Sequence, residues 1–436
     1  MYITLLQQNE KSMNKLFIVI RIATCISLMS LQVSAQNEKF CGQKVVGYVP
    51  YYRSTSQIAA VDYKNLTHAF FAFVFPTANG TLKTFTGYEK TQFNNSLNSF
   101  ITNADKGGAK KVISMGGQYG GTDFLNLSID SAYRHKLADT LISFCKKYNF
   151  VGADLDWEGL SSDEEYNGYL LLCKTLGTRL HAENLLFIAT VPASGYNGDF
   201  FPEDGLKYAD WIQAMSYDAT GTWAQSPYGN HSSYELHVSA HNYWKGRGIA
   251  DDKIIVGVPF YGYKFPSKSG GSGTALSYAS IIAKYSNLAD NINETDDFTW
   301  FNGPQLIRDK VQYSLDKKLG GIMIWEMTQD ALGAKSLHKV IVDKYNGVCP
   351  IAGLDDLTSA KIDFIITETT ISILNNDIKE KGDFSIYNLQ GQRIATATLA
   401  SGQTTAAFDN RLPKDSFLVL VSILDGKTYS YKFSIQ

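Results

Sequence analysis

Short apolar runs alternate with amphipathic segments along most of this 436-residue chain. The apolar runs are rich in β-branched residues, which is typical of strands buried on both faces, and most segments between them have the spacing of helices. In one such segment Leu137, Leu141, Phe144 and Tyr148 fall on one helical face. The runs predicted to be strands are KVVGYV, LTHAFFAFVF, KKVISMGG, FVGADLDWE, LLFIATVP, WIQAMSYD, KIIVGVPFYG and GGIMIWEM.

Alternation of strands and helices predicts an α/β fold with a parallel sheet. Eight strands within roughly 290 residues match the count and size of a (β/α)8 TIM barrel. The alternative is a doubly wound open sheet, which usually carries a glycine-rich phosphate loop after its first strand, and GYVPYYRS is no such loop. We therefore expect a (β/α)8 barrel over residues 41–349.

The pattern changes after Cys349. From Ile371 onward no segment has convincing helical spacing, whereas FSIYNLQG, RIATATL, SFLVLVSIL and KTYSYKFSIQ alternate as strands do. Asp425 and Gly426 form a two-residue hairpin signal between the last two of these segments. The pattern predicts a small all-β sandwich domain over residues 365–436, joined to the barrel through LDDLTSAK.

The N-terminal segment has the features of a secretory signal. Lys15 precedes the apolar stretch LFIVIRIATCISLMSL, and the small-residue sequence VSA ends just before Gln36. The apolar stretch is shorter than the roughly 20 residues that a membrane span needs. We expect a signal peptide over residues 1–35, starting at Met1 or Met13, and a secreted protein, extracellular or at the cell surface, without a membrane span.

The cysteines add one structural prediction. Cys145 and Cys173 lie on apolar helical faces, where buried thiols are ordinary. Cys41 precedes the first predicted strand, and Cys349 follows the last predicted helix. Because barrel closure brings such chain ends together and export permits oxidation, we predict a Cys41–Cys349 disulfide. No cysteine pair has the spacing of a zinc site.

Composition and charge exclude several kinds of partner. The chain is 44% hydrophobic and 19% charged, as expected of a folded protein with a sizeable core. A formal net charge of −2 and the absence of basic runs predict no attraction to nucleic acid or to anionic lipid. The chain is rich in aromatic residues, with 26 Tyr, 24 Phe and 6 Trp. For the Trp residues, core packing and stacking against a flat-faced ligand such as a sugar both remain open.

The fourth predicted strand carries the candidate chemistry. Asp154, Asp156 and Glu158 alternate with Leu155 and Trp157, so the carboxyls share one face, about 6.5 Å apart along the strand. In a TIM barrel the C-terminal ends of the strands face the active-site mouth, which places Glu158 nearest solvent and Asp154 deepest. Packed carboxyls cannot all ionise cheaply, so at least one pKa should rise. A carboxyl protonated near neutral pH is the general acid that cleavage of a glycosidic bond needs.

Two other interpretations of this strand are weaker. A solvated strand end does not explain the small and apolar residues Gly152, Ala153, Leu155 and Trp157 around the acids. The segment DLDWEGLSSDEE also approaches a calcium-binding loop. Its eighth position, however, is Ser161 rather than an apolar residue, and the segment that enters it has the pattern of a strand.

Taken together, the motifs resemble glycoside hydrolase family 18, the chitinase family. The signature of its fourth strand is D-x-x-D-x-D-x-E. Asp154, Asp156 and Glu158 match the last three acids, and Val151 replaces the first. SMGG resembles the S-x-G-G of the third strand, and QAMSYD the Q-x-M-x-Y-D of the sixth. GYVPYY and GGIMIWEM resemble the first and eighth strands, so the resemblance covers about residues 44–347.

The resemblance implies a secreted, monomeric chitinase that cleaves β-1,4 bonds between N-acetylglucosamine residues by substrate-assisted retaining catalysis, without a cofactor or metal. Glu158 would act as general acid and base, and Asp156 would hold the acetamide N–H. Asp154 would share a proton or hydrogen bond with Asp156, and Tyr217 would donate to the acetamide oxygen. The residues that it implies for binding chitin or N-acetylglucosamine oligosaccharides are Tyr48, Phe73, Gly117, Trp157, Gln213, Met215, Asp218 and Trp325.

One departure from the family concerns the cleft. Many chitinases insert a small α+β module between strands seven and eight. Here about fifty-five residues separate Gly262 from Gly320, and PSKSGGSGTALS has the composition of a loop. We therefore expect the module to be absent and the groove to be shallow and open, which suits internal cleavage.

The C-terminal domain and the substrate each leave an alternative. In FSIYNLQGQRI, LPKDSFLVLVSI and DGKTYSYKFSIQ the domain resembles the sorting domains of type IX secretion substrates in Bacteroidetes, and a small carbohydrate-binding sandwich is the alternative. For the barrel, one rival function is an endo-β-N-acetylglucosaminidase acting on N-glycans, which uses the same acid strand. The other is a non-catalytic chitin-binding lectin, which typically lacks the acid equivalent to Glu158.

Overall fold

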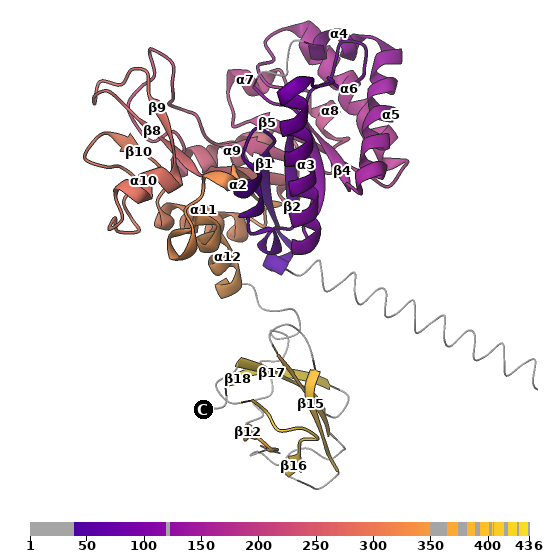
Figure 1. Ribbon diagram of the computed structural model, residues 1–436, viewed down its shortest axis with the longest axis vertical. Coiled ribbons are helices and arrows are strands. Elements are labelled where there is room, and N and C mark those ends of the chain that lie inside the picture. Colours follow the sequence, from indigo (N-terminus) through magenta and orange to yellow (C-terminus); the bar gives the residue numbers. More distant parts are fainter. Residues whose placement is uncertain are drawn as a thin grey trace, which may run out of the picture. The chain divides into compact units, whose positions relative to one another are not determined.

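The computed structural model divides into two compact units, one over Gly42–Gly347 and a second that contains Val348–Gln436. They are described separately (Figure 1). The structure describes residues 39–118, 123–348, 364–373, 382–388, 393–400, 403, 405–413, 417–424 and 427–434.

The first unit is a closed parallel barrel with the strand order β1-β11-β7-β6-β5-β4-β3-β2 (Figure 1). Each of its eight strands coincides with one of the apolar runs predicted from the sequence, with β1 one residue longer than its run, so the predicted TIM barrel is confirmed. The barrel strands are β1 (Lys44–Pro50), β2 (His68–Val74), β3 (Lys110–Gly116), β4 (Gly152–Asp156), β5 (Leu186–Pro192), β6 (Trp211–Met215), β7 (Ile254–Pro259) and β11 (Gly321–Trp325).

Helices lie between successive strands and cover the outside of the barrel (Figure 1). Local signals set their ends: the Asp130 side chain accepts hydrogen bonds from the backbone of Ala132 and Tyr133, and Ser162 caps the next long helix. Such caps stabilise a helix by about 1 kcal/mol each. The helices are α2 (Thr55–Ala59), α3 (Gly87–Gly107), α4 (Phe124–Ile129), α5 (Ser131–Tyr148), α6 (Asp163–His181), α7 (Tyr196–Asp199), α8 (Glu203–Leu206), α9 (Tyr234–Gly246), α10 (Tyr278–Lys284), α11 (Pro304–Asp316) and α12 (Leu337–Val348).

The barrel interior is a packed core rather than a pore. Large side chains from several strands fill it, and burial of each large apolar side chain contributes about 1.5–3 kcal/mol. Space beneath the site depends on Gly257 of β7, where a Cβ would come within 2.7 Å of the Tyr217 ring. The buried core cluster comprises Val46, Tyr48, Phe70, Ala72, Phe73, Val112, Ile188, Trp211, Ile255 and Met323.

A small α+β insertion lies between β7 and β11, so the expectation that this module is absent was wrong. It consists of α10 and a three-stranded antiparallel sheet of order β10-β8-β9. The insertion could not be recognised in the sequence, because its first strand begins almost directly after β7 and its other two strands are short. Asp297 pairs with both Lys264 and Lys284 and so ties the insertion together. Its strands are β8 (Tyr261–Lys264), β9 (Thr274–Ser277) and β10 (Thr299–Trp300).

The second unit contains two antiparallel sheets, of order β12-β13-β16 and β15-β14-β17-β18. The four predicted strands are those of the larger sheet, and Leu424 pairs with Lys427 across the predicted two-residue hairpin. The three strands of the smaller sheet were not predicted. The strands are β12 (Phe364–Ile366), β13 (Thr370–Ile373), β14 (Gly382–Asn388), β15 (Arg393–Leu399), β16 (Thr405–Ala407), β17 (Phe417–Leu424) and β18 (Lys427–Ser434).

The cysteine and membrane predictions are tested in part. Cys145 and Cys173 are free and buried, as expected, and Cys41 is disulfide-bonded. Cys349 lies outside the described residues, so its pairing with Cys41 stays a prediction. The predicted signal peptide, residues 1–35, also lies outside them. In the part of the chain that the structure describes, no helix is long and apolar enough to cross a membrane.

Candidate active site

Strand β4 carries the acid trio into the barrel mouth. Asp154 is fully buried, Asp156 is 4% exposed, and Glu158, just beyond the strand, is half-buried. This order of burial follows the predicted depth, because alternate residues of one strand point the same way and successive ones lie nearer its C-terminal end.

Asp154 lies beneath the cleft, enclosed by hydroxyl groups from neighbouring strands. Its Oδ2 accepts hydrogen bonds from Tyr48 of β1 at 2.9 Å and from Ser114 of β3 at 2.6 Å. Its Oδ1 accepts one from Thr190 of β5 at 2.9 Å. Burial raises the pKa of Asp154 to about 6, although these hydrogen bonds act to lower it. The carboxyl is therefore held in one orientation at the base of the site.

Asp156 is the least satisfied of the three acids. Among the described residues its Oδ1 is buried without a hydrogen-bond partner, yet the residue lines the cleft. Burial, together with the charges of Glu158 and Asp154, raises its pKa well above the usual value. A buried polar oxygen without a partner calls for an explanation, and a ligand that supplies the partner is one.

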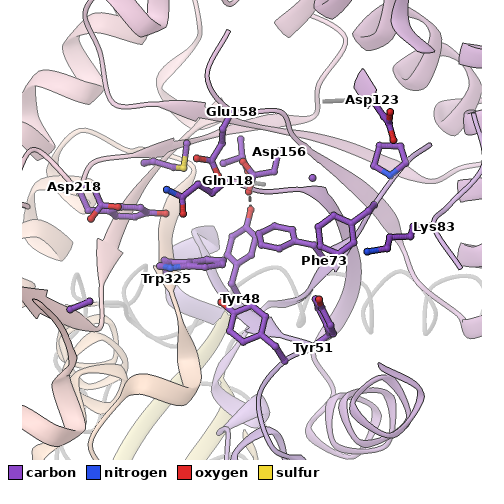
Figure 2. Close-up of a pocket in the computed structure, with 18 of the residues that line it drawn as sticks. Tyr48, Tyr51, Phe73, Lys83, Gln118, Asp123, Asp156, Glu158, Asp218 and Trp325 are labelled. Atoms are coloured by element: carbon purple, nitrogen blue, oxygen red, sulfur yellow. Dashed lines mark hydrogen bonds between the residues drawn. The ribbon is translucent and has the colours of Figure 1, made fainter. Parts of the chain in front are cut away.

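Glu158 stands at the cleft wall with the properties of a general acid. Burial, followed by the nearby charge of Asp218, raises its pKa to about 7. A carboxyl with that pKa still carries a proton near neutral pH and can lose and regain it in one reaction cycle. Figure 2 shows Glu158 and Asp156 together on one side of the cleft.

Asp218 follows β6 and is fixed by groups outside the cleft. Its Oδ1 accepts hydrogen bonds from Tyr261 at 2.6 Å and Tyr263 at 2.9 Å, and lies 3.4 Å from Nδ1 of His231. Burial acts to raise the pKa of Asp218, but these partners outweigh it, and the pKa lies below its usual value. Asp218 is therefore an anion near Glu158, and its charge adds to the effect of burial in raising the pKa of Glu158.

Tyr217 presents a hydroxyl group to the same part of the cleft. Burial and the surrounding carboxylates raise its pKa well above the usual value, so the hydroxyl keeps its proton. Its hydrogen bond to the thioether of Met323 is long, at 3.7 Å, and sulfur is a weak acceptor. The hydroxyl is thus available to donate to a stronger acceptor on a ligand.

Aromatic rings line the cleft near the acids. Trp325, at the end of β11, is half-buried and stacks on Phe73 with ring centroids 5.7 Å apart and planes 26° apart. The ring of Tyr48 meets Trp325 edge-on at 5.5 Å. An exposed indole face of this kind suits the flat face of a sugar ring.

The acids and aromatic residues open into one cleft of about 870 Å³ (Figure 2). Of the predicted site residues, Tyr48, Phe73, Asp156, Glu158, Met215, Tyr217, Asp218 and Trp325 line it. Tyr51 and Tyr52 were missed although they belong to the quoted GYVPYY segment. The other missed residues lie mostly on loops without a periodic signal and include Phe75, Pro76, Thr77, Lys83, Gly116, Gln118, Asp123, Thr190, Thr222, Tyr263 and Ala275.

Three predicted binding residues do not line the cleft. Trp157 is 1% exposed and stacks on Phe124 of α4 at 5.1 Å, because it points from β4 toward the helix layer. Gln213 is buried and donates to the Tyr48 hydroxyl at 2.8 Å. The backbone N–H of Gly117 donates to the Asp156 carbonyl oxygen at 2.8 Å. Trp157 therefore packs in the helix layer, whereas Gln213 and Gly117 contact residues at or beneath the cleft. That these three residues bind substrate stays a prediction.

The calcium-loop interpretation has no support in the described residues. Gly152–Asp156 is a strand, and Glu165 accepts a hydrogen bond from the Ser161 backbone at 2.8 Å instead of turning toward the acids. Within the described ranges, no group of three or more His, Cys, Asp and Glu side chains could hold a metal ion.

A parallel barrel with a graded acid trio at the mouth of its fourth strand defines an acid–base enzyme of the TIM-barrel class. A family model, Glycosyl hydrolases family 18, matches residues 44–330. The chain therefore belongs to glycosyl hydrolases family 18 and is a glycoside hydrolase.

The relatives that this chain resembles include several chitinases. Chitinase 1 of Aphanocladium album is 27% identical over 66% of this chain and 81% of its own length. The chitinase ChiB from the chitin utilization locus of Flavobacterium johnsoniae is 30% identical, with a TM-score of 0.59, over 70% of this chain and 94% of that one. A chitinase from Bacteroides thetaiotaomicron is 25% identical, with a TM-score of 0.60, over 70% and 96% of the two chains.

Proposed function

We propose that this enzyme is a chitinase that hydrolyses β-1,4 bonds between N-acetylglucosamine residues with retention of configuration, using the 2-acetamido group of the substrate as nucleophile. The relatives described above, which are chitinases by name, support the choice of polymer. The cleft supports the chemistry, because it offers one proton donor with a pKa of about 7, Glu158, beside groups suited to an amide.

The observation that carries the proposal is the buried, unpartnered Oδ1 of Asp156 at the cleft wall. An acetamide N–H bound there would satisfy an oxygen that otherwise has no partner among the described residues. The same interaction would turn the acetamide oxygen toward the anomeric carbon of its own sugar. Cellulose carries a 2-hydroxyl group instead, which has no carbonyl oxygen to close such a ring onto the anomeric carbon.

The reaction then needs one acid and no enzyme nucleophile. The acetamide oxygen attacks the anomeric carbon while Glu158 protonates the departing glycosidic oxygen, which leaves an oxazolinium ion and the glutamate anion. Asp156 holds the N–H of this cation and stabilises its charge. Glu158 next removes a proton from water, which attacks the anomeric carbon and reopens the ring. Two inversions at one carbon give net retention.

Neighbouring residues would orient the reacting sugar. The hydroxyl of Tyr217 donates a hydrogen bond to the acetamide oxygen, and Trp325 stacks beneath the sugar ring. After burial, the charge of Asp218 is the second cause that raises the pKa of Glu158. Asp154, held by Tyr48 and other hydroxyls, shares a proton or hydrogen bond with Asp156 from below.

Two rival functions make different predictions. An endo-β-N-acetylglucosaminidase would cut a high-mannose glycopeptide rather than chitin oligosaccharides. A non-catalytic lectin would bind without cutting, and the retained Glu158, with its raised pKa, argues against that function. We expect cleavage of chitin oligosaccharides and not of the glycopeptide when both are incubated with the enzyme and read by mass spectrometry.

The retaining mechanism is tested by the anomer of the product. The first-formed chitin product should be the β-anomer by NMR, and a thiazoline mimic of the intermediate should inhibit. Cellulose oligosaccharides should not be cut. An initial α-anomer, or comparable cleavage of cellulose oligosaccharides, would overturn the mechanism and the roles of Asp156 and Tyr217.

We also propose that the protein is exported through the signal segment at residues 1–35 and acts as a monomer outside the cell or at its surface, with the C-terminal domain serving secretion. The sequence features described above support this proposal. Exported protein whose N-terminus begins at Gln36 is the expected result of N-terminal sequencing.

A further inference from the structure

Asp218 is held by a buried histidine whose function nothing above assigns. We propose that His231 is a positioning residue: it locks the backbone and the carboxylate of Asp218 in the one arrangement that serves the reaction at Glu158. The inference rests on the proposed function, since it concerns how Asp218 is positioned relative to the proposed acid, Glu158. It is carried by the bonds, backbone angles and packing around Asp218.

The backbone of Asp218 is in the left-handed region, with φ of 63°. Non-glycine residues rarely adopt that conformation, although aspartate does so more readily than most, so contacts that hold it there matter. The described bonds to its carboxylate all reach Oδ1, and the side chain remains 48% exposed in the cleft. One oxygen is therefore tied down on the side of β8, while the other is left to face the cleft.

His231 is placed to enforce this conformation. Its ring is fully buried and packs against Tyr261 and Tyr263, with ring centroids 4.9 Å and 4.8 Å away. Nε2 lies 3.2 Å from the carbonyl oxygen of Tyr261. A carbonyl oxygen only accepts hydrogen bonds, so Nε2 carries a hydrogen and is fixed to strand β8.

The other ring nitrogen ends on Asp218 in either protonation state. Nδ1 lies 3.4 Å from the Asp218 backbone nitrogen and 3.4 Å from its Oδ1. With Nε2 protonated, a neutral ring uses Nδ1 to accept from the backbone N–H of Asp218, and a charged ring uses it to donate to Oδ1. The imidazole thus joins Asp218 to β8 whether it is neutral or charged. Only its partner atom on Asp218 changes, from the backbone nitrogen to Oδ1.

Loss of this link has a chemical consequence. The charge of Asp218 is one of the two causes that raise the pKa of Glu158. An Asp218 that relaxed to a negative φ would move its carboxylate relative to Glu158 and to the neighbouring Tyr217. A displacement of about 1 Å at a reacting group can cost up to 10²-fold in rate.

A purely structural role for His231 is the competing explanation, and His241 offers a matched control. His241 is also buried, bonds through both ring nitrogens, to Tyr313 at 2.7 Å and Asp251 at 2.8 Å, and meets a tyrosine ring edge-on. None of these residues lines the cleft. Removing either imidazole should cost stability, but only the loss of His231 should alter the reaction.

The test compares His231→Ala, Tyr261→Phe and His241→Ala in the full chain, with chitotetraose as substrate. We expect kcat for His231→Ala to fall about tenfold to a hundredfold, with KM changed less than threefold. The alkaline limb of kcat/KM should move to lower pH, because Glu158 loses part of the field that raises its pKa. Tyr261→Phe removes one donor to Oδ1 and should act in the same direction, more weakly. The titratable groups facing Asp218 and Glu158 are Asp156, Tyr217, His231, Tyr261 and Tyr263.

Equal kcat losses in His231→Ala and His241→Ala, or an alkaline limb that does not move, would contradict the proposal. A crystal structure of His231→Ala, or of Tyr261→Phe if the first does not fold, reads the positioning directly. Asp218 should leave its positive φ or turn Oδ1 away from β8, and an unchanged Asp218 overturns the inference. A wild-type enzyme that cuts no chitin oligosaccharide would reject the proposed function alone, since the variant structure still answers for His231.

Discussion

The carboxyl groups of Asp154 and Asp156 on β4, and of Glu158 just beyond it, differ in pKa because their surroundings differ. Asp154 accepts three hydrogen bonds and has a pKa of about 6. One oxygen of Asp156 has no partner among the described residues, and its pKa lies well above its usual range. Glu158 is less buried than either and has a pKa of about 7. Burial raises the pKa of each of the three carboxyl groups. Only at Asp154 do hydrogen bonds offset part of that rise. The proton donor at the cleft wall follows from this gradient.

Glu158→Gln should abolish hydrolysis while leaving oligosaccharide binding largely intact. The amide keeps the size and hydrogen bonding of the acid but has no proton to give, and general acid catalysis is worth on the order of 10²-fold or more. Initial rates on chitotetraose and calorimetric titration with the same ligand measure the two effects. Residual activity within a few-fold of wild type would place the acid elsewhere.

The same variant should be more stable than wild type at alkaline pH. Because the pKa of Glu158 is about 7 in the folded chain and 4.5 is its ordinary value, the folded chain binds more protons between these values. Its stability therefore falls as pH rises through that window. Glutamine does not titrate, so the Tm of Glu158→Gln minus the Tm of wild type should increase from pH 4 to pH 8. A difference that stays constant or decreases would contradict the raised pKa of Glu158 in the folded chain.

At the scale of elements, close approach of strands holds the site in place. Gly257 of β7 lies against Tyr217, and a Cβ there would also come within 3.0 Å of the Ala214 carbonyl oxygen. Backbone cannot yield as a flexible side chain can, so the ring of Tyr217 would have to move. The position couples packing in the barrel directly to a residue of the cleft.

Gly257→Ala should lower stability by about 1–3 kcal/mol and kcat by about tenfold or more. Gly246→Ala at the end of α9 is the matched control, because a Cβ there meets nothing within 4 Å. Chemical denaturation and kcat on chitotetraose measure the two effects. A Gly257→Ala enzyme with the kinetics of the Gly246→Ala control would show that Tyr217 tolerates displacement.

The elements that the sequence predicts are those with a periodic signal. Buried parallel strands are continuous apolar runs, which is why the barrel strands and the acid face of β4 could be found. The orientation of Trp157 could not be taken from the motif, because a motif position says nothing about which way a side chain points, although strand alternation already directed it away from the acids. His231 and Tyr261 could not be linked to Asp218, since their contact arises only when the segment after β6 meets strand β8 in the folded chain.

At the scale of the whole molecule, the site belongs to one unit. Every residue that lines the cleft falls between Tyr48 and Trp325, inside the Gly42–Gly347 unit. None of the cleft residues that the structure describes comes from the two antiparallel sheets of the second unit. Hydrolysis of a soluble substrate should therefore not require it.

A chain truncated after residue 363 should cut chitotetraose within about twofold of the full-length rate, because the truncation retains the whole cleft and Cys349. Parallel initial-rate measurements on the two proteins, with a Tm for each, provide the check. A tenfold loss of rate at an unchanged Tm would show that the second unit takes part in turnover.

The insertion after β7 limits how the groove can be remodelled. Its strand β8 both supplies Tyr263 to the cleft wall and donates two of the bonds that fix Asp218. Shortening this segment to admit bulkier polymers would also remove the hydrogen bonds that fix the Asp218 carboxylate near the proton donor Glu158. Substrate width and turnover rate are thus not independent design variables in this enzyme, and a broader groove is better sought in the β2–α3 loop, which contributes Thr77 and Lys83 to the wall.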